Sequence, residues 1–262
     1  MLFTDTHTHL DGVEFDDDRD EVVQRAQEAG VGRMFVPAID MLSAERALAL
    51  SERYPGYVYP MIGLHPEEVK ADYESVLKAM RAMLSTRFIA VGEVGLDYYW
   101  SRESEKEQLA AFEEQVCWSV ETRLPLMIHC RKAQNEMVAL LRRYEKDLPG
   151  GVFHCFTGNE HEAAELLRFD RFVLGIGGVL TFKKSHLPEV LPHVPLSRIV
   201  LETDSPYMAP VPMRGQRNES SFVRYVLERI AICYGITPEA VADATEATVE
   251  RIFRLHATDV VL

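Results

Sequence analysis

The sequence predicts an α/β protein that folds as a (β/α)₈ barrel. Short apolar runs alternate with amphipathic segments along the whole 262-residue chain, and the alternation repeats eight times. Histidines or carboxylates stand at the ends of several of these runs. Strand-then-helix repeats favour a parallel sheet, and eight of them in a chain of this length favour a closed barrel. A doubly wound open sheet is the alternative.

The expected elements follow one another without interruption. The predicted strands, in chain order, lie at residues 2–7, 33–37, 57–63, 88–93, 125–129, 151–154, 172–176 and 199–204. The predicted helices lie at residues 19–29, 43–54, 73–84, 103–121, 133–144, 160–168, 187–191, 221–234 and 238–255. Apolar runs mark the strands, helical periodicity marks the helices, and Gly30 ends the first helix. Neither a linker nor a shift in composition is visible, so we expect residues 1–262 to form one domain.

Composition narrows the class of protein. Hydrophobic residues make up 47% of the chain and charged residues 26%, which is ordinary for a globular protein. No apolar run has the length of a membrane helix and no signal peptide is visible, so we expect a cytoplasmic protein without membrane contact. Cys117, Cys130, Cys155 and Cys233 form no CxxC pair and are expected to be free thiols. The net charge of −13 argues against a surface that grips nucleic acid throughout, but allows a local cationic site built on metal ions.

Six potential metal ligands stand at the ends of predicted strands. His7 and His9 are two residues apart, so on a strand both would point to the same face. Because the carboxyl ends of barrel strands meet at one rim, we expect the six side chains to converge there. The six are His7, His9, Glu93, His129, His154 and Asp204. They exceed the needs of one tetrahedral ion and favour two divalent ions bridged by Glu93. A mixture of histidine and carboxylate favours Zn²⁺ or Mn²⁺.

The chain resembles the TatD family of metal-dependent hydrolases and deoxyribonucleases. The matching segments run in family order and are DTHTHLD (5–11), GLHPEE (63–68), VGEVGLDYY (91–99), MIHCR (127–131), FHCFTG (153–158), GIGGVLTFK (175–183), LETDSPYMAP (201–210) and RGQRNES (214–220). The resemblance implies a barrel of the metallo-dependent hydrolase type, with the same six residues as metal ligands. It also implies hydrolysis of phosphodiester bonds, with DNA trimmed from the 3′ end. The metal in use would be Mg²⁺ or Mn²⁺, with Zn²⁺ plausible as the bound species.

Three residues are candidates for the reaction itself. Asp204 would bind one metal and accept the proton of the attacking water; ligation alone is the alternative. His65 would contact a phosphate oxygen, or would only cap its own turn. Arg131 would share the face of His129 and clamp the phosphate, or would form an ion pair on the rim.

Other residues are candidates for supporting roles. Asp5, Asp97 and Glu202 are expected to orient ligand histidines. The cationic residues that follow the seventh and eighth strands are expected to steer the substrate, or else are only solvated charges. The aromatic residues that follow the fourth strand are expected to stack on bases, or else only pack the rim of the barrel. These residues are Lys183, Lys184, Arg214, Arg217, Tyr98, Tyr99 and Trp100. Cys130 and Cys155 each follow a ligand histidine and are expected to face the outer helices.

One position departs from the family pattern, and two rival functions stay open. Ser220 stands where the family usually has proline, and it is expected to cap the helix that follows. A metallohydrolase acting on another ester, such as a D-aminoacyl-tRNA, is the first rival. The second is a non-enzymatic metal-binding partner of a protein-export or quality-control system. No protein partner can be named from the sequence.

Overall fold

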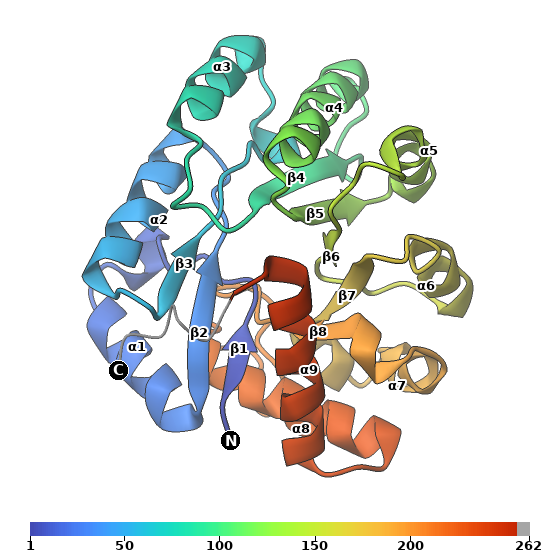
Figure 1. Ribbon diagram of the computed structural model, residues 1–262. Coiled ribbons are helices and arrows are strands. Elements are labelled where there is room, and N and C mark those ends of the chain that lie inside the picture. The colour runs from blue at the N-terminus through green and yellow to red at the C-terminus, as the bar shows by residue number, and fades with distance from the viewer. Residues whose placement is uncertain (256–262) are drawn as a thin grey trace.

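The computed structural model describes residues 1–255 and has eight parallel strands arranged in sequence order (Figure 1). The strands are β1 (Phe3–Asp5), β2 (Val31–Val36), β3 (Val58–Pro60), β4 (Val91–Asp97), β5 (Leu126–Arg131), β6 (Gly151–Phe153), β7 (Phe172–Ile176) and β8 (Ile199–Leu201). Continuous pairing joins β1 to β3 and β4 to β8. The predicted strand positions hold, although β4 begins later than expected and runs on to Asp97.

Two short seams close the strands into a barrel. The bridge between Ile62 and Val91 links β3 to β4. At the other seam, the amide of Thr6 donates to the carbonyl of Leu201 at 2.9 Å, and Thr8 pairs with Ser205. The fold is therefore the predicted (β/α)₈ barrel, and the open-sheet alternative is wrong.

The helices form a ring outside the strands (Figure 1). They are α1 (Arg19–Ala29), α2 (Met41–Arg53), α3 (Tyr73–Met83), α4 (Glu105–Thr122), α5 (Gln134–Tyr144), α6 (Glu160–Leu166), α7 (Leu187–Val190), α8 (Val223–Tyr234) and α9 (Pro238–Phe253). Each predicted helix is present, with ends that agree within two residues. Among the described residues, none of these helices combines the length and apolar character that crossing a bilayer requires.

The apolar core lies in two layers. The larger one fills the space between the strands and the outer helices. The smaller one lies inside the barrel, where Phe35, Met127 and Val200 pack against Ile252 and Phe253 of α9. The last helix, α9, thus packs against the apolar layer inside the barrel. The polar residues of the predicted site lie at the carboxyl end of the barrel. The four cysteines are free thiols, as predicted, whereas the cytoplasmic location stays a prediction.

Candidate metal centre

The predicted ligands lie at the carboxyl end of the barrel because strand alternation aims them there. Met127 and Val200 point into the barrel interior. Residues two or four positions further along the chain point the same way. His129 therefore extends the interior face that begins with Met127, whereas Asp204 lies beyond the end of β8 in a left-handed conformation with φ 56°.

Glu93 faces the interior through an irregularity in β4. Ala90 belongs to the interior layer, so strict alternation would turn Glu93 outward. The register between β4 and β5 shifts between Val91 and Val94, which adds one residue to β4. An extra residue of this kind redirects the side chains that follow it. Glu93 is consequently buried at 2% exposure among the histidines.

The ligand atoms form three overlapping groups; the first two share His7 and the last two share Glu93. In each group the atoms lie within 4.8 Å of one another, which is close enough for one ion to contact all of them. The groups are His7–His9–Asp204, His7–Glu93–His154 and His65–Glu93–His129. The two oxygens of Glu93 lie 3.2 Å from His7 Nε2 and 2.8 Å from His154 Nε2. The two oxygens of Glu93 thus face different histidines, whereas its role as a bridge between two ions stays a prediction.

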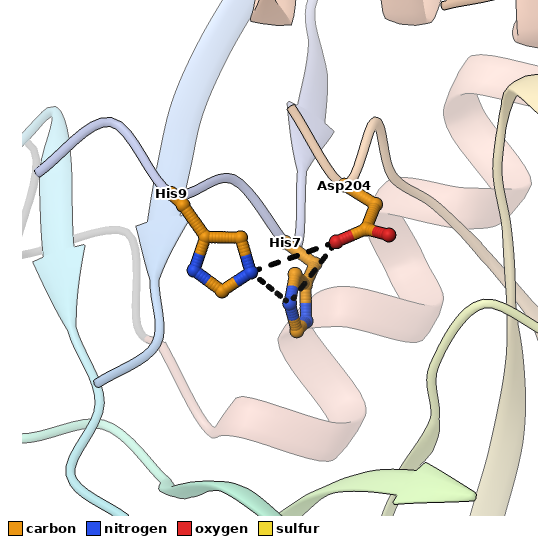
Figure 2. A group of neighbouring side chains, drawn as sticks. All are labelled: His7, His9 and Asp204. Atoms are coloured by element: carbon orange, nitrogen blue, oxygen red, sulfur yellow. Dashed lines mark hydrogen bonds and ion pairs between the residues drawn. The ribbon is translucent and has the colours of Figure 1, made fainter. Parts of the chain in front are cut away.

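Figure 2 shows the group that contains the HxH pair. The Nε2 atoms of His7 and His9 face each other at 3.3 Å. The Oδ1 atom of Asp204 lies 3.8 Å from the first and 3.5 Å from the second. Two imidazole nitrogens and one carboxylate oxygen converging in this way form a donor set that suits a divalent transition metal.

The ionisation of the side chains in the cluster favours the binding of a cation. Burial lowers the pKa of His9 and His129, but the hydrogen bonds that they donate to neighbouring carboxylates outweigh this effect and raise both values to about 9. Burial likewise opposes ionisation of Asp204, yet the hydrogen bond from His9 holds its pKa below the usual range. The carboxylates therefore stay ionised and attract positive charge, which bound divalent ions supply in place of protons.

Asp97 positions His129, as expected. Its Oδ2 atom lies 2.9 Å from His129 Nε2, and its Oδ1 atom accepts from the amide of Tyr99. Because an ionised carboxylate only accepts, His129 must carry a proton on Nε2. This leaves Nδ1 to face Glu93 at 3.0 Å.

Neither Asp5 nor Glu202 forms a hydrogen bond with a ligand histidine ring, so their expected orienting role stays a prediction. Asp5 accepts hydrogen bonds from the amide and hydroxyl of Thr203 at 2.9 and 2.7 Å, and thereby ties β1 to the segment after β8. Glu202 lies 3.9 Å from His154 Nδ1, too far for a hydrogen bond, and accepts from the amide of Cys155 at 2.5 Å. Both carboxylates hold the backbone beside a ligand, and burial raises the pKa of Glu202 to about 8.

His65 lies within the cluster. Its Nδ1 atom accepts from the amide of Glu67 at 3.2 Å, which caps the short helical turn Pro66–Glu68. Its Nε2 atom faces Glu93 at 3.4 Å. The sequence indicated a phosphate contact for His65, whereas this geometry is equally suitable for a metal ligand.

A cavity of about 750 Å³ opens above the cluster. We call it the central cavity. Its wall includes the ligand side chains other than His7, together with Asp11, Glu14, Glu67, Glu68, Trp100, Cys130, Arg131, Cys155, Tyr207 and Met208. Cys155 was expected to face the outer helices. It instead lines this cavity, because β6 ends at Phe153 and the turn gives Cys155 a left-handed conformation with φ 49°.

The three arginines predicted to contact the substrate separate into two kinds. Arg131 lines the central cavity, with its guanidinium carbon 3.5 Å from the ring centre of Tyr99. Arg217 instead forms an ion pair with Asp18 at 2.7 Å, and Arg214 stacks on Phe182 at 3.9 Å. Neither of the latter two lines the central cavity, because both fasten the long loop after β8 to neighbouring segments. Their predicted role in substrate binding is not supported by this placement.

Ser220 does not cap a helix. It is the first residue of the turn Ser220–Phe222, whose capping position is Glu219. Glu219 is held by Arg25 at 2.6 Å. The loop before this turn is fixed instead by Asn218, whose amide donates to the carbonyls of Thr203 and Tyr207 at 2.9 and 2.6 Å.

Comparison with known proteins identifies the family. The sequence profile of the family described as TatD related DNase matches residues 4–254. The chain is 37% identical over 258 residues to the uncharacterized metal-dependent hydrolase YabD of Bacillus subtilis, with 98% of this chain and 100% of the relative covered. It is 32% identical over 257 residues to the 3′-5′ ssDNA/RNA exonuclease TatD of Pectobacterium carotovorum, with 96% and 99% covered.

A solved structure supports the same assignment. The crystal structure of YJJV, a TatD homolog from Escherichia coli, matches with a TM-score of 0.88 at 29% identity, covering 97% of this chain and 98% of that one. The chain therefore belongs to the TatD-related DNase family and is a metal-dependent hydrolase with a buried histidine and carboxylate cluster.

Proposed function

We propose that this protein is a divalent-metal-dependent phosphodiester hydrolase that removes nucleotides from the 3′ end of single-stranded DNA. The observation that carries the proposal is the cluster of ligand atoms bridged by Glu93 at the base of an open cavity. Two ions fit this donor set, with Mg²⁺ or Mn²⁺ in use and Zn²⁺ as a bound species. Relatives about 32% identical are named 3′-5′ ssDNA/RNA exonucleases, which supports this substrate class.

The residues of this chain have separate tasks in the proposed reaction. His7, His9 and Asp204 would hold one ion, and Glu93 with His154 or His129 would hold the other. The chemistry that bound divalent ions supply is neutralisation of the phosphate charge and activation of a water nucleophile. Asp204, kept ionised by its neighbours, is placed to accept the proton of that water.

Arg131 would bind the phosphate. It is the one arginine or lysine on the wall of the central cavity among residues 1–255. Its guanidinium stacks on Tyr99 and forms no ion pair within that described range. An arginine in this state can offer two parallel N–H donors to a phosphate.

The test uses single-stranded oligonucleotides labelled at the 5′ end. Purified protein with Mn²⁺ or Mg²⁺ should shorten DNA stepwise from the 3′ end and release mononucleotides, and an RNA oligonucleotide is run beside it. Asp204→Asn should lower kcat by at least about 100-fold, since one group serves as ligand and base. Circular dichroism checks that this variant is folded.

Absence of nucleotide release by the wild-type protein with any divalent metal would refute the proposal. Hydrolysis of a D-aminoacyl-tRNA under those conditions would then favour the other ester. Metal binding without hydrolysis of either substrate would favour the non-enzymatic role.

A further inference from the structure

Two exposed aromatic rings stand at opposite sides of the central cavity. Trp100 follows β4 and is 75% exposed, and Tyr207 follows β8 and is 57% exposed. Both line the cavity that contains the metal ligands. In an eight-stranded barrel whose strands follow sequence order, β4 and β8 are four positions apart and face each other across the rim.

We propose that Trp100 and Tyr207 stack on the two bases that flank the scissile phosphate of a single-stranded nucleic acid. This inference rests on the proposed nuclease function and specifies how the substrate is held. A phosphodiester carries one nucleoside on each side of its phosphorus. A phosphate bound at the central metal cluster would therefore direct one base toward β4 and the other toward β8.

Each ring is held at its edge and leaves surface free. The ring of Trp100 meets Tyr99 edge-on, with centroids 4.7 Å apart and planes at 86°. Tyr207 meets His9 edge-on at 6.3 Å between centroids. The guanidinium carbon of Arg131 also lies 5.8 Å from the ring centre of Trp100, but the exposed fractions of 75% and 57% leave surface on both rings for stacking.

The electrostatics of the cavity make stacking the favoured mode of binding. Carboxylates dominate the wall, with Asp11, Glu14, Glu67 and Glu68 in addition to the ligands. Arg131 is the single arginine or lysine on this wall within the described part of the chain. Lysine and arginine contacts, which supply most affinity in many nucleic-acid complexes, are therefore scarce here. Stacking on an aromatic face needs no charge and is worth about fivefold to hundredfold per base.

Two properties of the substrate follow from this arrangement. Every base has a π face, so stacking alone discriminates little between sequences. Bases in a duplex are already stacked and paired, so an unpaired end should be bound in preference to a blunt duplex end. A preference for single strands would therefore come from Trp100 and Tyr207.

The experiment combines protein variants with abasic substrates. kcat/KM is measured for Trp100→Ala and Tyr207→Ala on an intact oligonucleotide, and on two that lack the base at the terminal or the penultimate position. Each alanine variant should lose about fivefold to hundredfold on the intact strand. On one of the two abasic strands, each alanine variant should be as active as the wild type. That strand should be a different one for Trp100→Ala and for Tyr207→Ala. Trp100→Phe and Tyr207→Phe should recover most of the activity.

Controls separate stacking from damage to the site. Ile232→Ala removes an apolar side chain that is 68% exposed on α8, and it should leave kcat/KM unchanged. Metal content and circular dichroism should be the same for all variants. Equal losses on intact and abasic strands, or alanine variants within twofold of the wild type, would overturn the inference while the nuclease function stands. An inactive wild type would instead refute the proposed function, and this inference with it.

Discussion

Replacing Gly175 by alanine should destabilise the barrel from the inside. Gly175 lies in β7, and a Cβ atom built there would lie 2.0 Å from Oε2 of Glu202 and 2.7 Å from its Cδ. Since ordinary contacts begin near 3.4 Å, the carboxylate would have to recede by roughly 1.4 Å. Glu202 is fully buried and has no solvent to move into. Its displacement would break the hydrogen bond to the amide of Cys155, beside His154.

The cost can be estimated from these two effects. Overpacking a buried site costs about 1–3 kcal/mol, and a buried amide left without its acceptor costs about 1–3 kcal/mol more. We expect Gly175→Ala to lower the free energy of unfolding by about 2–6 kcal/mol. Metal affinity should fall as well, by about tenfold, because His154 loses its neighbouring support.

Urea denaturation followed by tryptophan fluorescence measures the effect, since Trp118 is buried at 1% exposure. Gly177→Ala is the matched control, because its Cβ would meet nothing closer than 3.5 Å. If the clash with Glu202 is the cause, Gly175→Ala should lower the free energy of unfolding only slightly in a protein that already carries Glu202→Ala. A Gly175→Ala protein within 0.5 kcal/mol of the wild type (about the precision of such measurements) would refute the reasoning.

Three further predictions concern other parts of the site and its surroundings. Asp97→Asn should present an amide donor to Nε2 of His129 and force the ring proton onto Nδ1. Metal binding, measured by calorimetry, should weaken about 10–100-fold. An unchanged affinity would exclude a positioning role for Asp97. Asp18→Asn should cost at most about 1 kcal/mol at neutral pH. Since the hydrogen bond from Arg217 holds the pKa of Asp18 below its usual range, this cost should be complete above about pH 4 and should vanish as the pH falls further, as followed by urea titration. Arg131→Ala should raise KM for DNA about tenfold and make KM less dependent on salt concentration. Arg217→Ala should leave KM unchanged, because Arg217 is paired with Asp18. Equal effects of the two variants would contradict the placement of these arginines.

The sequence by itself determined the barrel and the approximate place of every element. Apolar strands and amphipathic helices have different periods, and that difference is written locally in the chain. The sequence also placed six potential ligands at the ends of strands. Barrel geometry then brings such positions together whatever lies between them, as His7 and Asp204 illustrate.

Only the tertiary structure decided how the polar groups are partnered. No local pattern reveals that an extra residue in β4 turns Glu93 inward, or that Glu202 occupies the space left by Gly175. Nor could residue type distinguish Arg131, which lines the central cavity, from Arg217, which Asp18 binds elsewhere. Such pairings join residues far apart in the chain, and they depend on ångström-scale distances that side-chain chemistry alone does not specify.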